Sequence, residues 1–88
     1  METLTTTPHD FIWRVKNPQD YWANTCNEVK CIVEVNGIVL GKFNSVNRSF
    51  DDDRCYVNFY DINDNLKYCS VDSNSEMILR PIEGEKNG

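Results

Sequence analysis

From residue 28 onward, hydrophobic and polar residues alternate in short runs that are separated by turn-forming residues. This two-residue period predicts β-strands, because successive side chains of a strand point to opposite faces. The runs "EVKCIVEV" and "IVLGKF" flank Asn36-Gly37. Asn-Gly is the pair that most readily takes positive φ at both central positions of a type I′ turn, so we predict a β-hairpin here.

The register of that hairpin predicts which side chains enter the core. Val35 should face Ile38 and Val33 should face Leu40, because the turn fixes the pairing. One face then carries Val29, Cys31, Val33, Val35, Ile38 and Leu40. The opposite face carries Ile32, Val39 and Phe43, which is unusually apolar for a solvated surface. We expect the N-terminal segment or a partner to cover it, and these three residues are candidates for an oligomer interface.

A second hairpin is predicted from "RCYVNFYD", a loop around "INDN", and "LKYCSV". A loop of two or four residues would place Phe59 opposite Tyr68 and leave Tyr56 and Tyr60 on the reverse face, whereas a loop of three would exchange the faces. The last strand, "EMILR", is expected to end at Pro81 at a sheet edge, because proline cannot donate a ladder hydrogen bond.

Two interpretations fit the first 27 residues, which contain the related segments "TPHDF" and "NPQDY". Each is typical of a helix start, with Thr7 or Asn17 as the N-cap and proline at the first helical position. However, "DFIWRVK" alternates Phe11, Trp13 and Val15 with polar residues, as a strand does. We expect a strand at residues 10–16 and a short helical turn at 18–24.

These elements predict a mainly β fold, a small single-domain antiparallel barrel or sandwich of five to six short strands with one short helical turn near the N-terminus. Residues 10–82 should form the domain, between flexible segments at 1–9 and 83–88. A chain of 88 residues buries only about 60–65% of its unfolded surface, so a deep catalytic cleft is not expected.

The net charge of −5 lies mostly in the second half, where residues 45–88 carry nine acidic and five basic side chains. Such a surface repels phosphate backbones, so we expect no direct nucleic-acid binding and an attraction to basic protein surfaces. The first residues show no basic segment followed by an apolar stretch, and no apolar run approaches the length of a membrane span. We therefore expect a cytoplasmic protein away from the membrane, with its four cysteines as thiols.

Catalytic and metal-binding patterns are weak in this chain. Asp61, Asn63 and Asn65 begin like an EF-hand loop, but Leu66 stands where the loop requires glycine, so we interpret them as a hairpin turn. The cysteines are not arranged in the close pairs of zinc sites. The only histidine is His9, and the glycines are isolated. We expect no enzyme, no metal and no cofactor.

The remaining candidates are surfaces for binding. Partner contacts are expected from an acidic run and from aromatic side chains outside the core: Asp51, Asp52, Asp53, Tyr56, Tyr60, Tyr21 and Trp22. Tyrosine and tryptophan commonly anchor interfaces, because they offer a large contact area with few rotamers to fix. Carboxylates can also engage the Arg and Lys groups of a partner.

We therefore expect a non-enzymatic intracellular binding protein. The combination is typical of small inhibitors encoded by phages and mobile elements, which would block a host protein such as a nucleic-acid-binding or defence protein. The alternative is a β-barrel that binds or sequesters a nucleotide or another small ligand as a homo-oligomer.

Overall fold

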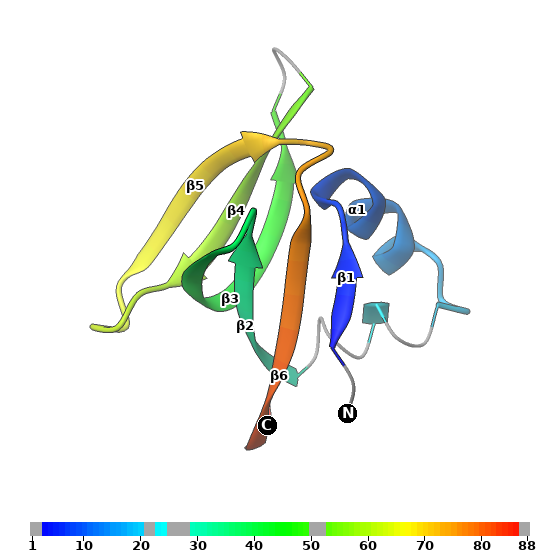
Figure 1. Cartoon of the computed structure of the whole chain (residues 1–88). Helices are drawn as coiled ribbons and strands as arrows, with labels where there is room; N and C mark the ends of the chain where they lie inside the picture. Colours follow the sequence, from blue (N-terminus) through cyan, green and yellow to red (C-terminus); the bar gives the residue numbers. More distant parts are fainter. Residues whose placement is uncertain (1–2, 21–22, 25–28, 50–52, 87–88) are drawn as a thin grey trace.

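Six strands form one antiparallel sheet in the order β1-β6-β2-β3-β4-β5, with one short helix against it (Figure 1). The computed structural model describes residues 3–20, 23–24, 29–49 and 53–86. The elements are β1 (Leu4–Thr6), α1 (Pro8–Lys16), β2 (Val29–Val35), β3 (Ile38–Arg48), β4 (Arg54–Tyr60), β5 (Leu66–Asp72) and β6 (Met77–Lys86). The radius of gyration of 12.1 Å is that of a single domain of this length. The predicted mainly β, antiparallel, single-domain fold is confirmed.

The hairpin at Asn36-Gly37 forms as predicted. Both residues have positive φ, 50° and 83°, as a type I′ turn requires. The buried face of β2 is also as predicted, because Cys31, Val33 and Val35 are at most 4% exposed. The Asn36 side chain ties this turn to the start of β6, where its Oδ1 accepts from the backbone N–H of Glu76 at 3.2 Å.

Strand β3 contains two β-bulges that the sequence pattern does not reveal. Val35 pairs with Ile38, but Val33 pairs with Gly41, so the predicted pairing of Val33 with Leu40 is wrong. Leu40 is the extra residue, and a second irregularity follows between Phe43 and Ser45. Each bulge bends its strand and increases the local twist. Ile38, expected in the core, is 65% exposed beside the turn.

The segment that we expected to be a strand at 10–16 is a helix. Thr7 caps α1 by accepting a hydrogen bond from the Asp10 N–H at 3.1 Å, and proline follows at the first helical position. Phe11 is buried and Val15 packs against the core, while Trp13 is 56% exposed. The apolar residues four apart thus face the sheet, and the alternating pattern was misleading.

A hydrogen-bonded turn follows α1 near the predicted helical turn at 18–24. Asp20 accepts at Oδ1 from the Ala23 N–H at 3.1 Å, and the Asn24 N–H donates to the Asp20 carbonyl at 3.2 Å. Residues 21–22 lie outside the described part of the chain. Asp20 also holds Arg14 with an Nε to Oδ2 distance of 2.7 Å, so this turn is fixed to α1.

Regular structure extends beyond residues 10–82 at both ends of the chain. β1 lies within the segment 1–9 that we expected to be flexible, and β6 continues past Pro81 to Lys86 instead of ending there. β6 is an inner strand between β1 and β2. The register of β1 with β6 ends at the pair Leu4 and Leu79, so Pro81 faces no β1 partner within the described residues.

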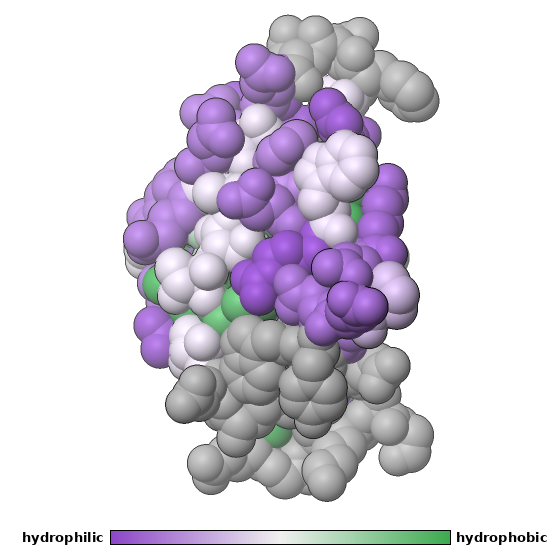
Figure 2. All heavy atoms as spheres, turned by 90° about the vertical axis from the view of Figure 1, so that its right-hand side faces the viewer, coloured by the Kyte–Doolittle hydropathy of each residue, from purple (hydrophilic) through white to green (hydrophobic). Residues whose placement is uncertain are grey.

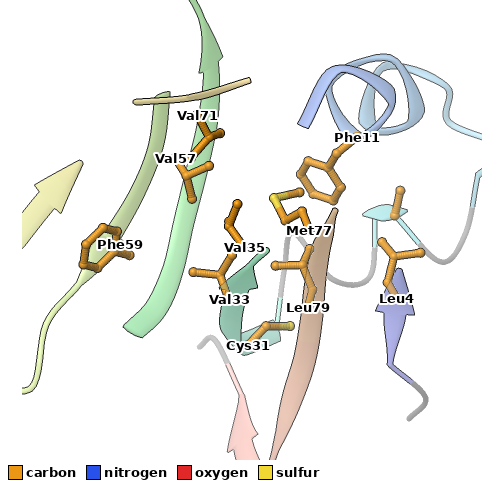
Figure 3. Close-up of a cluster of buried hydrophobic side chains, with 11 residues drawn as sticks. Leu4, Phe11, Cys31, Val33, Val35, Val57, Phe59, Val71, Met77 and Leu79 are labelled. Atoms are coloured by element: carbon orange, nitrogen blue, oxygen red, sulfur yellow. The ribbon is translucent and has the colours of Figure 1, made fainter. Parts of the chain in front are cut away.

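The core lies between α1 and the face of the sheet that carries the odd-numbered residues of β2, β4 and β6 (Figure 3). Figure 3 shows Phe11 of α1 directed toward Met77. Phe11 also meets Phe43 of β3 edge to face, with ring centroids 5.4 Å apart. The side chains that form the core are Leu4, Phe11, Ala23, Cys31, Val33, Val35, Val57, Phe59, Val71, Met77 and Leu79. The outer face of the sheet is therefore left to other contacts.

Candidate binding face

Strand β4 places tyrosines on the outer face of the sheet. Cys55, Val57 and Phe59 are buried, while Tyr56 and Tyr60 on the opposite side are 37% and 38% exposed. This alternation is the one that the sequence predicts for β4. Because β4 is an inner strand bonded to β3 and β5, the backbone that carries both tyrosines is held on both sides.

The loop at residues 61–65 decides which side chains of β5 join these tyrosines. Asp61 Oδ1 accepts from the N–H groups of Asn63 at 2.8 Å and Asn65 at 2.9 Å, and Asp64 has φ of 61°. This loop is longer than those we considered, so the predicted pairing of Phe59 with Tyr68 is wrong. Tyr68 pairs with Asn58 instead and is 70% exposed on the outer face.

The same shift of register moves Val71 into the core. Val71 pairs with Cys55 and is 8% exposed, whereas the predicted register put it on the reverse face. Asp61 also meets Lys67, with Oδ2 3.0 Å from Nζ. The backbone N–H of Asn65 and the Lys67 ammonium lower the pKa of the Asp61 carboxyl. The Asp–Asn cluster is thus hairpin chemistry, as we interpreted it.

Tyr56 and Tyr68 form the centre of a shallow hollow on the outer face. Their rings meet nearly at right angles, 83°, with centroids 5.6 Å apart. The hollow has a volume of about 300 Å³ and is lined by Asn47, Tyr56, Asn58 and Tyr68. We call Tyr56, Tyr60, Tyr68, Asn47 and Asn58 the tyrosine face.

Hydrogen bonds orient the amides of the tyrosine face. Asn58 Nδ2 donates to Ser45 Oγ at 3.1 Å and to Asn47 Oδ1 at 3.3 Å. Both amide hydrogens of Asn58 are therefore engaged, and its Oδ1 remains as an acceptor of fixed direction. The hollow thus combines two aromatic rings with an oriented carbonyl oxygen.

Arg54 closes one end of the tyrosine face. Its Nε donates to Ser70 Oγ at 2.9 Å, its Nη1 to Asp72 Oδ1 at 2.9 Å, and its Nη2 to the Ser70 carbonyl at 3.0 Å. The charges of Arg54 and Asp72 therefore neutralise each other at the surface.

Asp53, the last residue of the acidic run, directly precedes Arg54 in the sequence. Asp51 and Asp52 lie outside the described residues, as do Tyr21 and Trp22. Asp53 is exposed, and its carbonyl accepts from the Ser73 N–H at 2.8 Å. Asp53 also borders a hollow of about 230 Å³ that is lined by His9, Arg48, Asp53, Arg54, Ser73 and Asn74. The described part of the acidic run therefore lies among basic side chains.

Only part of the predicted oligomer interface lies on the outer face. Val39 is 61% exposed there and Ile32 is half-buried. Phe43 was assigned to this face wrongly, because the bulge at Leu40 reverses the faces of β3 and turns Phe43 toward Phe11 in the core. Ile78 of β6 lies on the outer face instead of Phe43, because Val39 and Ile78 both pair with Glu34 and therefore share its face.

Reactive groups are not concentrated in the described part of the chain. Within it, no three of the His, Cys, Asp and Glu side chains lie close enough together to hold a metal ion. Cys55 is 1% exposed, and burial raises the pKa of its thiol, with Arg48 nearby acting in the opposite direction. A buried thiol of raised pKa is a poor nucleophile at neutral pH.

A wider hollow lies on the side formed by α1 and β1, with a volume of about 540 Å³. Figure 2 shows that this side is mostly hydrophilic. Trp13 lines the hollow, but its ring already has two neighbours. Lys16 Nζ lies 5.3 Å from the centroid of the Trp13 ring, and the His9 ring meets it edge to face. Arg14, which also lines it, is held by Asp20. Trp13 and Arg14 in this hollow therefore already have interaction partners within the chain.

No match was found among protein-family models, curated proteins or solved structures. In the part of the chain that the structure describes, every helix is too short or too polar to cross a bilayer. A function for this chain must therefore be proposed from the geometry of its surface.

The tyrosine face contains residues that sequence reasoning missed. Tyr68 was hidden by the wrong loop length, although Asp61 followed by Asn63 and Asn65 is a pattern that can cap a longer loop. Asn58 could have been found, because it alternates with the buried Val57 and Phe59. Asn47 lies beyond the predicted strand segment that ends at Phe43, and the two bulges of β3 each reverse its faces, so together they leave Asn47 on the same face as Val39.

Proposed function

We propose that this protein is a non-enzymatic binding protein whose tyrosine face covers a basic surface of a protein partner. The observation that supports this most strongly is the perpendicular pair of Tyr56 and Tyr68, exposed beside the oriented carbonyl of Asn58. Aromatic rings that a monomer leaves exposed on a rigid strand are available to anchor an interface.

The composition of the face suits contact with another protein. Tyrosine provides a large, rigid contact area at low conformational cost, and asparagine and serine provide adaptable hydrogen bonds. Here Tyr56 and Tyr60 stand on an inner strand, and Asn58 is fixed by Ser45 and Asn47. Little side-chain freedom would therefore be lost on binding.

A basic partner is favoured by charge and by ring chemistry. The net charge of −5 attracts cationic surfaces over distances of about a Debye length. A guanidinium group can stack on the face of a tyrosine ring while it donates to a carbonyl oxygen. Tyr56, Tyr68 and Asn58 Oδ1 offer both interactions in one hollow.

Occupation of such a surface would inhibit the partner. Arg and Lys groups that a nucleic-acid-binding protein turns toward phosphates would be engaged by this face and by the acidic run that precedes Arg54 in the sequence. The run contributes Asp53, which lines a hollow with Arg54 and Arg48, and Asp51 and Asp52 precede it in the sequence. This mode of inhibition needs no catalytic residue.

An NMR titration of the isotope-labelled protein with an arginine-rich peptide tests the proposal. A peptide of the same length with glutamate in place of arginine is the control. We expect the arginine peptide to shift the resonances of Tyr56, Asn58 and Tyr68, with an affinity that falls as salt is added. The glutamate peptide should shift none of them.

Two variants separate the face from general charge attraction. Replacing both Tyr56 and Tyr68 by alanine should weaken binding of the arginine peptide at least about tenfold, as loss of an interface anchor does. Ile62→Ala, at a loop residue that is 97% exposed, should leave the affinity unchanged. Equal affinity for the double variant and the wild type would contradict the proposal.

A further inference from the structure

Strand β5 forms a long open edge of the sheet. It has seven residues and, among the residues that the structure describes, only β4 as a neighbouring strand, whereas the other edge strand, β1, has three residues. Its pairing with β4 is regular, without a bulge, and it contains no proline. Proteins usually protect such edges, because unpaired N–H and C=O groups accept another strand.

Hydrogen bonds at both ends of the β4–β5 ladder show which backbone groups point outward. The Asp61 N–H donates to the Asn65 carbonyl at 3.0 Å, and the Ser73 N–H donates to the Asp53 carbonyl at 2.8 Å. Bonded and non-bonded pairs alternate along an antiparallel ladder. Asp61 with Asn65 and Asp53 with Ser73 are bonded pairs, so every β4–β5 pair that lies an odd number of residues along the ladder from them is non-bonded. The residues of β5 whose N–H and C=O groups face away from β4 are Leu66, Tyr68, Ser70 and Asp72.

Two of these outward groups already have partners. The Ser70 carbonyl accepts from Arg54 Nη2 at 3.0 Å, and the Asp72 carbonyl accepts from the Ser75 N–H at 3.0 Å. Within the described residues, the open groups that remain next to each other are the N–H and C=O of Leu66, the N–H and C=O of Tyr68, and the N–H of Ser70. This set is nearly symmetric about Tyr68.

We propose that β5 pairs with β5 of a second copy of this chain, antiparallel and with the two-fold axis at Tyr68. In this register the N–H and C=O of Tyr68 bond to those of the second Tyr68. The Ser70 N–H donates to the second copy's Leu66 carbonyl. The Leu66 N–H donates to the second copy's Ser70 carbonyl, which then shares its two lone pairs among this N–H, Arg54 Nη2 and the weaker Cys69 thiol donor at 3.9 Å.

The alternative register, with the axis at Cys69, is less well matched. It would require the carbonyls of Ser70 and Asp72 as the acceptors on both sides of the axis, and both already have partners. The register at Tyr68 instead uses the five adjacent open groups of the edge and needs only one carbonyl that already has a partner, that of Ser70; the Asp72 N–H stays outside the pairing. A self-complementary patch of this kind is what a two-fold interface requires.

Side chains are compatible with the register at Tyr68. Lys67 would stand opposite Cys69 of the second copy, so no like charges face each other directly, and Lys67 already has Asp61 as its counter-ion at 3.0 Å. On the outer face the two Tyr68 rings become neighbours. Each copy thereby extends the tyrosine face of the other, and this pairing does not depend on the identity of any other partner.

Molar mass in solution tests the pairing. Light scattering after size exclusion, over a range of concentrations, should give twice 10.2 kDa for the wild type at high concentration. Tyr68→Lys should give 10.2 kDa, because two lysines would face each other at the axis. Tyr60→Lys, the same change one strand further in, should remain dimeric. Circular dichroism of both variants checks that they fold.

A monomeric wild type at every concentration would overturn the proposal. A dimer that survives Tyr68→Lys would overturn it as well and would direct attention to Ile32 and Val39. Neither result bears on the arginine-peptide titration, which uses the tyrosine face of one copy. The two proposals therefore fail separately.

A disulfide trap tests the register. Opposed residues of a non-bonded antiparallel pair have Cα atoms about 4.5 Å apart, within the range of about 4.4–6.8 Å that a disulfide spans. Lys67→Cys should therefore cross-link to Cys69 of the second copy under mild oxidation and give a dimer on non-reducing gels. The same variant with Cys69→Ser should give no cross-link. Absence of the dimer from Lys67→Cys would exclude the axis at Tyr68.

Discussion

The guanidinium group of Arg54 reaches the outer side of strand β5 and donates a hydrogen bond from Nη2 to the carbonyl oxygen of Ser70 at 3.0 Å. Arg54 belongs to the neighbouring strand β4, so its side chain lies across β5 on the outer face of the sheet. This contact covers one of the two outward-facing carbonyls of β5 that already have partners, the other being that of Asp72. Arg54 would therefore limit, without preventing, the proposed addition of a second copy's strand.

We predict that Arg54→Ala strengthens self-association. Removing the guanidinium leaves only the weak Cys69 thiol donor at 3.9 Å to compete for the Ser70 carbonyl with the Leu66 N–H of the second copy, which should tighten the dimer by about three- to tenfold. The loss of an exposed ion pair with Asp72 should lower the free energy of unfolding by no more than about 1 kcal/mol. Sedimentation equilibrium measures the first effect and urea denaturation the second.

Arg80→Ala is the matched control for that variant. Arg80 is also exposed and paired with an acid, Glu34 at 3.8 Å, but it lies on β6 away from the open edge. Its loss should leave the dissociation constant unchanged. A weaker dimer in Arg54→Ala would show that the guanidinium supports the interface instead of limiting it.

Gly41 is the position in β3 where we expect a side chain to be least tolerated. A Cβ atom there would lie 2.3 Å from the Tyr60 carbonyl oxygen, and the residue has φ of +157°. The nearest obstacle is backbone of the adjacent strand, so it cannot move aside cheaply. Gly41→Ala should reduce the free energy of unfolding by about 2–4 kcal/mol in urea denaturation.

Gly37→Ala provides the comparison for Gly41. Gly37 also has positive φ, +83°, but a Cβ there meets nothing within 4 Å. Gly37→Ala should lower the free energy of unfolding only through backbone strain, by about 1–2 kcal/mol. If the two alanine variants were equally stable, close approach of β4 to Gly41 would not be the dominant effect.

The free energy of unfolding should depend on pH through the carboxyl of Asp61 in the loop at residues 61–65. Its pKa is lowered in the folded state, first by the Asn65 N–H and then by Lys67. A carboxyl with a lowered folded-state pKa stabilises the protein fully above its ordinary value of about 3.9 and loses this contribution as pH falls through the folded-state pKa. We therefore expect stability to fall at acidic pH.

Asp61→Asn isolates that contribution. The amide oxygen can still accept from the Asn63 and Asn65 N–H groups, but it no longer titrates or pairs with Lys67. The urea midpoint of this variant should fall less on acidification than that of the wild type. Asp20 also has a lowered pKa, with Arg14 as the main cause, so part of the acid dependence should remain. Identical pH profiles for variant and wild type would contradict the role of Asp61.

Local turn chemistry and face alternation were predictable wherever the strands are regular. The turn at Asn36-Gly37 and the buried side chains of β4 follow from rules that involve neighbouring residues only. Phe43 was misplaced because the bulge at Leu40 depends on how β3 meets β2 and β4, which no local pattern records. The close approach of the Tyr60 carbonyl to Gly41 also depends on how β3 meets β4.

The helix and the tyrosine face show two other limits of the sequence. Thr7 and Pro8 indicated the start of α1, but the alternation of Phe11, Trp13 and Val15 favoured a strand, and burial of Phe11 against β3 decided for the helix. Tyr68 was misplaced because one residue of loop length exchanges every side chain of a strand between faces. Tyr56 and Tyr60 were placed correctly, since they depend on β4 alone.

For the proposed pairing of two copies, the unequal lengths of the two sheet edges would determine how assembly ends. β1 offers only three residues, Leu4–Thr6, whereas β5 offers seven. If β5 pairs with its own two-fold copy as proposed, the described residues leave only the short β1 edges outside, and three residues are too few to recruit another sheet in series. The association would then close at two copies instead of growing into a filament.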